Sequence, residues 1–196
     1  MCVKIEPPII YRAIKDEELC EELFSCFERR QQVKNCWRKE DGRWVIRETP
    51  FVDDWGPEEY RILVRCLRHT LESGGVVFGA FQDGRMKGFA SVEGDPLGSK
   101  GQYRDLTSLH VSQEKRGHGI GKVLFQKAAD WARAGGAEKL YISSHSAVET
   151  QAFYRAMGCV EAKEYQCAHV QKEPYDCQLE YLLTAGSFSP GSPELE

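Results

Sequence analysis

The stretch that decides the fold runs from Arg116 to Ala132 and reads RGHGIGKVLFQKAADWA. Its glycines stand at alternate positions, 117, 119 and 121, between a strand-like pattern and an amphipathic helical pattern. A loop that leads from a strand into a helix presents free backbone N–H groups, and the helix dipole favours negative charge there. Glycine lets the backbone approach a phosphate closely, and Arg116 adds a positive charge. The stretch therefore predicts a strand–loop–helix unit that holds a phosphorylated ligand.

Two common nucleotide-binding motifs do not fit this loop. A P-loop needs Ser or Thr after its Gly-Lys pair, but Val123 follows Gly121 and Lys122, and Arg116 stands where a P-loop has its first glycine. A dinucleotide fingerprint needs the spacing G-x-G-x-x-G, whereas this loop has G-x-G-x-G. The next predicted strand, residues 139–145, also ends without the acid that would bind a ribose. Both nucleotide interpretations are therefore disfavoured.

The rest of the sequence predicts a mixed α/β sheet, because strand-like and helix-like periods follow one another along the chain. Helices are expected at residues 16–30 and 57–75, directly after the glycine loop, and at residues 146–158. Strands are expected at residues 9–14, 103–112, 139–145, 159–165 and 175–183, and hairpins at residues 36–47 and 76–94.

Turn and capping signals predict several contacts within these elements. Asp41-Gly42 and Asp83-Gly84 are type I′ turn signals at the centres of the two hairpins. They predict four facing pairs: Glu40 with Arg43, Trp37 with Ile46, Phe81 with Met86, and Phe78 with Phe89.

Capping signals mark the ends of two helices. Helix 57–75 is expected to begin with Gly56 as N-cap and Pro57 at N1. Helix 146–158 is expected to have Ser146 as N-cap, Glu149 at N3 and a left-handed Gly158 at its end.

Composition narrows the class of protein. A length of 196 residues suits one domain, expected at residues 1–183, with a disordered tail at 184–196. The formal net charge of −4 gives no electrostatic case for nucleic acid or an anionic membrane. There is no apolar run of about 18 residues and no signal-peptide core, so a cytoplasmic protein is expected. The eight cysteines form no C-x-x-C pair and the histidines no cluster with acids, which predicts reduced thiols and no metal site.

Two segments together carry a family resemblance. Residues 116–121, RGHGIG, match the pattern R/Q-x-x-G-x-G/A, and they lie within LTSLHVSQEKRGHGIGKVLF at 106–125. The helix AVETQAFYRAMGC at 147–159 follows. In these motifs and in its element order the chain resembles the GNAT superfamily of acyl-CoA-dependent N-acetyltransferases. The resemblance implies an α/β, single-domain GNAT-like fold with a mixed central β-sheet flanked by helices. The hairpin in the N-terminal half is an insertion relative to the common core.

The resemblance also implies an activity and a cosubstrate. It implies transfer of an acetyl group from acetyl-CoA, without a metal, to a primary amine of a small molecule or peptide, by direct attack in a ternary complex. Pantetheine would lie along Leu109, His110 and Val111. The pyrophosphate would be held by the loop residues Arg116, Gly117, His118, Gly119, Ile120, Gly121 and Lys122. Family members often have Asn at the position of Ala147.

Catalytic residues follow from the same likeness. Tyr154 matches the family's general acid, which protonates the departing thiolate; the alternative is an aromatic residue of the core. Asp105 matches a position where some members carry the general base, acting directly or through water; the alternative is a strand-end acid in solvent or an ion pair. Glu93 is a weaker candidate for the same role, and His110 and His145 are interpreted as structural.

Period-two alternation predicts which side chains of the strand at residues 103–112 share a face. One face is expected to carry Asp105, Thr107, Leu109 and Val111, and the other Leu106, Ser108 and His110.

The acceptor side is expected in the segment before helix 57–75 and in hairpin 36–47. Asp53, Asp54, Trp55 and Trp37 are candidate acceptor-binding residues, because acids beside aromatic rings suit a cationic amine. The alternative is that the aspartates stabilise the positive end of the following helix and the tryptophans pack the hairpin. Adjacent residues of an extended segment point opposite ways, so at most one aspartate is expected to face the pocket.

Other functions remain open at this point. The same scaffold could serve as a non-catalytic acyl-CoA-binding regulatory protein, and the glycine loop could bind another phosphorylated partner. The expected partner is the amine acceptor, with no nucleic acid and no membrane, and a homodimer is left open.

Overall fold

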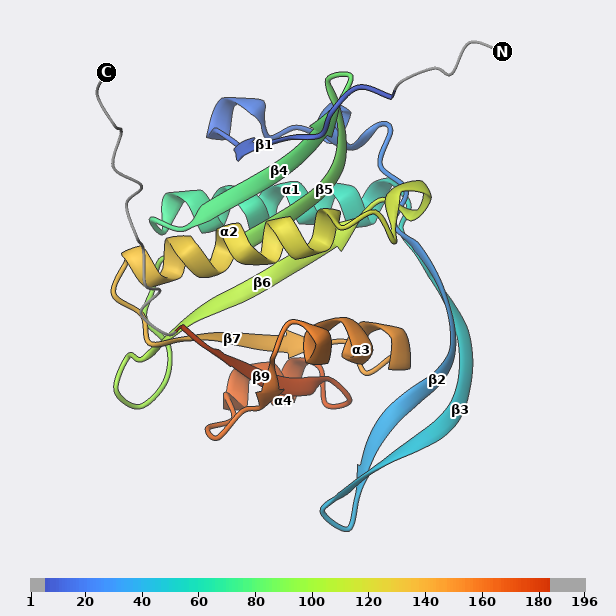
Figure 1. Ribbon diagram of the computed structural model, residues 1–196, viewed down its shortest axis with the longest axis vertical. Coiled ribbons are helices and arrows are strands. Elements are labelled where there is room, and N and C mark those ends of the chain that lie inside the picture. Colours follow the sequence, from blue (N-terminus) through green and yellow to red (C-terminus); the bar gives the residue numbers. More distant parts are fainter. Residues whose placement is uncertain (1–5, 184–196) are drawn as a thin grey trace, which may run out of the picture.

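A computed structural model describes residues 6–183 and shows one large mixed β-sheet with helices on both faces (Figure 1). Its seven strands are, in spatial order, β1 (Ile10–Ala13), β4 (Val76–Gln82), β5 (Arg85–Val92), β6 (Tyr103–Val111), β7 (Lys139–Ser144), β9 (Cys177–Leu182) and β8 (Val160–Glu161). Neighbouring strands are antiparallel except β6 and β7, which are parallel. The expected mixed sheet flanked by helices is confirmed.

Two helices cover opposite faces of this sheet. The core clusters show this, since adjacent residues of β4 belong to different clusters. Helix α2 (Ile120–Ala134) packs on the face that includes Val76 and Ala80. Helix α1 (Pro57–Glu72) packs on the face that includes Val77 and Phe81. The short helices α3 (Val148–Ala156) and α4 (Cys167–Lys172) lie beside β7 and β9 (Figure 1). None of the helices between residues 6 and 183 combines the length and the apolar character needed to cross a bilayer.

The second sheet is a long hairpin of β2 (Arg30–Glu40) and β3 (Arg43–Asp54), which lies to one side of the main sheet, beside α3 (Figure 1). Glu40 faces Arg43 and Trp37 faces Ile46, as predicted. The hairpin docks through its middle. Cys36 forms a bridge with Ala147, and the Trp37 N–H donates to the Ser146 carbonyl at 2.8 Å. The insertion is therefore attached to the loop between β7 and α3.

Of the two facing pairs predicted for the hairpin of β4 and β5, one is correct and one is wrong. Phe81 faces Met86, as predicted, but Phe78 faces Ala90, and Gly79 is the residue opposite Phe89. The prediction of a Phe78–Phe89 pair is wrong because the register shifts between Ala80 and Phe81, which leaves Lys87 as an extra residue in β5. The Lys87 carbonyl accepts a hydrogen bond from the Ser112 N–H at 2.9 Å. The bulge thus ties β5 to the start of the glycine loop.

The predicted helix at residues 16–30 is wrong. The segment forms two 3₁₀ turns, η1 (Asp16–Glu18) and η2 (Glu21–Phe24), with an extended Cys20 between them. Leu19 and Phe24 are both buried against the α1 face of the sheet. On one regular helix these two side chains would project about 140° apart. Burying both requires a break between them, and Arg68 donates to the freed Leu19 carbonyl at 2.7 Å.

Capping predictions have mixed outcomes. Gly56 is the N-cap of α1, Pro57 its first residue, and Gly158 is left-handed with φ of 91°, all as predicted. The predicted capping box of Ser146 and Glu149 is wrong, because α3 has Ala147 as its N-cap. The Ser146 hydroxyl accepts a hydrogen bond from Arg38 of β2 at 2.7 Å instead. Docking of the hairpin has therefore moved the helix start by one residue.

Two further differences concern the C-terminal third. Only Val160–Glu161 of the strand predicted at 159–165 forms β8, and α4 was not predicted at all. The expected disordered tail at 184–196 lies outside the described residues. Among residues 6–183, no group of three or more His, Cys, Asp or Glu side chains is arranged to hold a metal ion.

The packing of α2 on β5 yields a stability prediction. A Cβ on Gly88 would lie 2.9 Å from the Ile120 and Leu124 side chains, both of them buried, and 3.2 Å from the His110 carbonyl. We expect Gly88→Ala to lower the free energy of unfolding by about 1–3 kcal/mol, through overpacking under α2. Urea unfolding measures the difference.

Gly135→Ala is the matched control for Gly88→Ala. Gly135 ends α2 with φ of −79°, and a Cβ there would meet its nearest atoms at 3.5 Å, an ordinary contact. We expect this variant to be neutral or stabilised by up to about 1 kcal/mol. Equal stabilities of the two variants would contradict the close approach of α2 to β5.

Candidate active site

The candidate site is a cavity of about 800 Å³ at the point where β6 and β7 diverge. The two parallel strands pair over only three positions, the last of which is Asp105 opposite Tyr141. From Leu106 onward β6 keeps only β5 as its strand neighbour, and β7 keeps only β9. The space between them is lined by β6, the glycine loop, the end of β7, α3 and the first residues of the hairpin.

A second bulge sets the direction of the β6 side chains. Ser108 faces Ser91 and Leu106 faces Val92, so Thr107 is an extra residue. The predicted alternation is therefore wrong across this point. Leu106, Leu109 and Val111 pack with the core cluster under α2, and Leu106 does not share a face with His110.

The glycine loop has the geometry of an anion site. Gly117 and Gly119 have φ of 77° and 80°, a conformation that favours glycine. A Cβ at either position would meet nothing within 4 Å, so packing within the chain is not what requires glycine there. The backbone N–H groups of residues 117–122 donate to no acceptor in the described part of the chain. They stand at the N-terminus of α2, where the helix dipole adds to their attraction for an anion.

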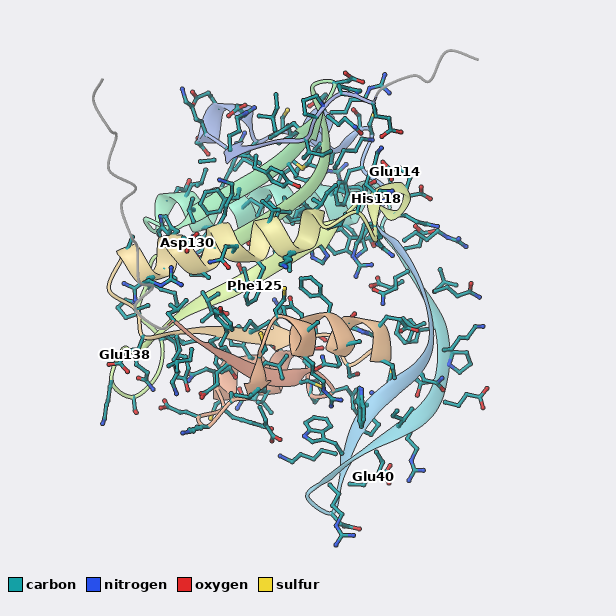
Figure 2. The ribbon with its side chains drawn as sticks, in the orientation of Figure 1. Glu40, Glu114, His118, Phe125, Asp130 and Glu138 are labelled. Atoms are coloured by element: carbon teal, nitrogen blue, oxygen red, sulfur yellow. The ribbon has the colours of Figure 1, made fainter. Side chains whose placement is uncertain are left out.

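Most of the predicted cosubstrate-binding residues line the cavity. They are Leu109, His110, Val111, Arg116, Gly117, Gly119, Ile120, Gly121 and Lys122. His118 is the exception, because its exposed ring turns back toward the Arg116 carbonyl, 2.8 Å from Nδ1. Figure 2 shows His118 near Glu114 at the outer end of the loop. His118 could thus contribute through its backbone alone.

Tyr154 lies in the cavity wall with its phenol protonated. The residue is 6% exposed and packs edge-on against Phe125, which extends from α2 (Figure 2), and against Phe153. Burial raises the pKa of Tyr154 well above its usual value. Its hydroxyl makes no hydrogen bond within residues 6–183, so this O–H is available to a ligand.

The two cavity histidines are neutral hydrogen-bond donors. His110 Nδ1 accepts from Arg29 Nε at 3.1 Å, and His145 Nδ1 accepts from the Ala147 N–H at 3.0 Å. Burial lowers the pKa of both rings, in His110 to about 3 with help from the Arg29 charge. Because Nδ1 is an acceptor in each ring, Nε2 carries the proton. Neither ring then has a free nitrogen to act as a base.

The candidate carboxylates lie just outside the cavity wall. Asp105 is buried and accepts from His169 Nε2 of α4 at 2.7 Å, while its Oδ1 has no hydrogen-bond partner in the described residues. Glu93 accepts from the hydroxyl of Thr107 at 3.1 Å, and Thr107 lines the cavity. The His169 contact was missed because α4 was not predicted.

A third carboxylate, Asp176, was also missed. Burial raises its pKa to about 6, and it accepts from the hydroxyl of Ser143 at 3.2 Å. Ser143 lines the cavity at the end of β7. Its position between α4 and β9 carries no motif, so the sequence alone offered no signal for it.

None of the four predicted acceptor-binding residues lines this cavity. Asp53 pairs with Arg29 at 2.7 Å, and Asp54 pairs with Arg30 on the surface at 3.3 Å. The Trp55 ring packs edge-on against His110, and Trp37 lies under Arg155 of α3. As expected for adjacent residues of a strand, the two aspartates point to different partners, and only Asp53 points inward.

Arg29 is a buried charged residue of the cavity wall that the sequence analysis did not single out. It precedes β2, is 8% exposed, and lines the cavity. In the sequence it is one of two adjacent arginines at the end of what was predicted as a helix, where cations suit the helix dipole. Its burial follows from the chain entering a strand at this point instead.

Comparisons with known proteins agree with this architecture. The profile of the acetyltransferase (GNAT) family matches residues 17–159. A search of curated protein sequences finds no significant match. A nourseothricin acetyltransferase structure is 18% identical, with a TM-score of 0.60, over 88% of this chain and 95% of that one.

Two similar structures were solved with a ligand. A Bacillus anthracis protein assigned as a streptothricin acetyltransferase, in complex with acetyl coenzyme A, is 15% identical with a TM-score of 0.64, over 88% of this chain and 96% of its own. The PaiA N-acetyltransferase of Thermoplasma acidophilum, in complex with coenzyme A, is 16% identical with a TM-score of 0.56, over 89% and 99%. At these identities the likeness shows the fold alone.

The Asp105–His169 pair yields a prediction for titration. The hydrogen bond to Asp105 raises the pKa of His169 above 6.5, while burial lowers it. We expect Asp105→Asn to lower the His169 pKa below its wild-type value, measured by NMR of the imidazole signals. Because the folded pKa is raised, the pair stabilises the fold below about pH 6.5 and this contribution is lost as pH rises through the raised value. The stability gap between wild type and variant should therefore shrink from pH 6 to pH 8.

Glu93→Gln is the control for this titration, since Glu93 does not contact His169. It should leave the His169 pKa unchanged. A His169 pKa that is the same in wild type and Asp105→Asn would show that the pair does not form in solution.

Proposed function

The chain belongs to the acetyltransferase (GNAT) family, and we propose that it transfers an acetyl group from acetyl-CoA to a primary amine of a small molecule or peptide. The single observation that carries the proposal is the continuity of the site. A row of unpaired N–H groups at residues 117–122 leads into a cavity whose wall holds the free, protonated phenol of Tyr154. Two structures of similar fold were solved with acetyl-CoA or CoA, which supports the choice of donor.

Acetyl-CoA would lie along the cavity from the loop to the divergence of the strands. Its pyrophosphate would take hydrogen bonds from the loop N–H groups, with Arg116 and Lys122 nearby. Pantetheine carries amides that can pair with a strand edge. The edge of β6 beyond Asp105 has no strand partner on the β7 side, so residues 109–111 offer that pairing.

The reaction would proceed by direct attack. The amine nitrogen uses its lone pair to attack the thioester carbonyl carbon, and the C–S bond breaks as the amide forms. The departing sulfur takes a proton, which we assign to the Tyr154 hydroxyl. The nitrogen gives up its surplus proton to the Tyr154 phenolate, directly or through water, as the amide forms, and this restores the phenol. A phenol with a raised pKa stays protonated at neutral pH, so its O–H can donate to the sulfur as negative charge develops there. Because a phenolate is a stronger base than a thiolate, the transfer depends on the return of a proton from the nitrogen to Tyr154.

The ammonium form of the amine must first lose a proton to a base. The hydrogen bonds at His110 and His145 argue against either ring, because each already uses Nδ1 as an acceptor. We propose Asp105, acting through water, with Glu93 behind Thr107 and Asp176 behind Ser143 as the competing carboxylates. All three carboxylates lie outside the cavity wall, which favours proton transfer through water over direct contact with the amine.

Thiol release from acetyl-CoA tests the proposed function. The acceptors to screen are polyamines, aminoglycosides, amino acids and short peptides, with each acetylated product identified by mass spectrometry. Release that depends on an amine supports the transferase. Tight acetyl-CoA binding without release in any mixture would favour the non-catalytic regulator.

The loop geometry yields a binding prediction. Gly119→Glu would place a carboxylate in the space in front of the loop and force a side chain onto a residue with φ of 80°. We expect acetyl-CoA binding, measured by calorimetry, to be lost. His118→Glu adds the same charge to the same loop on an outward side chain and should keep measurable binding. Wild-type affinity in a folded Gly119→Glu protein would refute the site.

The free phenol yields a kinetic prediction. Tyr154→Phe keeps the ring and removes the hydroxyl, so kcat should fall by about 100-fold or more while the KM for acetyl-CoA changes little. Tyr181→Phe is the control, because Tyr181 packs on the same Phe125 ring without lining the cavity. An unchanged kcat in Tyr154→Phe, with chemistry shown to be rate-limiting, would remove Tyr154 from the mechanism.

A further inference from the structure

We infer that the amine acceptor of this protein also carries a carboxylate, and that Arg29 binds that carboxylate. The inference rests on the proposed function and narrows its acceptor to zwitterionic amines such as amino acids and peptides with a free C-terminus. It starts from a cation that is buried in the wall of the cavity with part of its hydrogen-bonding capacity unused.

The hydrogen bonds of Arg29 account for only part of its guanidinium. Nε donates to His110 Nδ1 at 3.1 Å, and Nη2 donates to Asp53 Oδ2 at 2.7 Å. Nη1 is buried and has no partner within residues 6–183. A guanidinium carries five N–H donors in a rigid fork, and leaving a buried charged donor unpaired is costly. Because Arg29 lines the cavity, we assign this unpaired donor to an acceptor atom that comes from outside the chain.

The neighbouring groups on this side of the cavity are donors as well. His110 and His145 each present an Nε2–H, because Nδ1 of each ring is already an acceptor. Neither Nε2 belongs to the buried unpartnered atoms, so both remain accessible. The wall of one cavity therefore holds a guanidinium and two imidazole N–H groups, a set that complements oxygen atoms with negative charge and repels an ammonium group.

The anionic part of acetyl-CoA has its own site. The free N–H groups of residues 117–122 stand at the N-terminus of α2, together with Arg116 and Lys122. Arg29 precedes β2 and is held by Asp53 of β3 and by the Trp55 ring, with its guanidinium carbon 5.3 Å from the ring centroid. The acetyl group and the pantetheine amides are uncharged. A second buried cation on the hairpin side therefore matches a charge on the other substrate.

A carboxylate is the oxyanion that this arrangement fits best. Arginine presents parallel N–H groups that match the two oxygens of a carboxylate, and charge-assisted bonds of this kind are stronger than neutral ones. Asp53 neutralises the guanidinium in the free protein, so the bound carboxylate would share Arg29 with Asp53 rather than face an isolated cation. An acceptor without an oxyanion would offer Nη1 a weaker neutral acceptor or none.

Matched acceptors test the inference on the wild-type protein. L-Lysine, L-lysinamide and cadaverine share a primary amine on the same carbon chain and differ in the carboxylate. We expect kcat/KM to be about 10- to 100-fold higher for lysine than for either analogue, as for the loss of a charge-assisted hydrogen bond. The same ratio is expected between glycylglycine and glycylglycinamide. The amide lowers the pKa of a neighbouring amine and so supplies more of the reactive form, which works against the expected result.

The variant Arg29→Gln/Asp53→Asn assigns the preference to Arg29. It replaces the buried ion pair by two neutral amides, so that neither partner is left as an unpaired charge. We expect the ratio of kcat/KM between lysine and lysinamide to fall to near one. Arg30→Gln is the matched control, because Arg30 is the exposed neighbour that pairs with Asp54, and it should keep the wild-type ratio. Melting temperature and acetyl-CoA affinity are measured for each variant.

Each outcome separates the inference from the proposed function. Turnover with equal kcat/KM for lysine and its analogues would overturn the role of Arg29 and leave the transferase intact. A preference that survives in the double variant, or a double variant that loses acetyl-CoA affinity, would also overturn it. No thiol release with any amine would overturn the proposed function itself.

Discussion

The early end of the pairing between β6 and β7 is the constraint on which the rest of the structure depends. After Asp105 and Tyr141 the two central strands separate, and each is left with one unpaired backbone edge in the middle of the molecule. Unpaired backbone groups in a protein interior must find partners elsewhere. The chain leaves this edge open on β6, where a ligand rich in amides can take the place of a strand.

The hairpin joins the two sides of the opening. At its base Arg29 is bonded to His110 of β6, and two residues later Gln31 reaches Thr150 of α3 at 3.4 Å. Further along, β2 is paired to the loop after β7 through Cys36. The start of β2 and the residue before it thus connect β6 to α3. The cavity walls are positioned by the hairpin as well as by the sheet.

Those parts of the fold that depend on local chemistry could be predicted from the sequence. The two Asp-Gly turns gave correct pairs beside each turn, and the glycine loop gave the strand–loop–helix unit. Errors arose where distant segments override local preference. Burial of both Leu19 and Phe24 breaks the expected helix, the hairpin displaces Ser146 from its cap, and bulges at Lys87 and Thr107 shift the register. In the site, motif residues were found, whereas Arg29, His169 and Asp176 depend on tertiary contacts that no short pattern encodes.

Beyond the bulge at Thr107, the length of β6 is constrained in a way that the length of the hairpin is not. Inserting one residue after Ser108 would exchange the two faces of the strand beyond the insertion. Leu109 and Val111 would leave the core under α2, and His110 would lose Arg29. The hairpin is held at its sides, so residues added at its Asp41-Gly42 tip would extend into solvent. Over evolutionary time, insertions and deletions should accumulate at that tip, while the central strand can change only in its side chains.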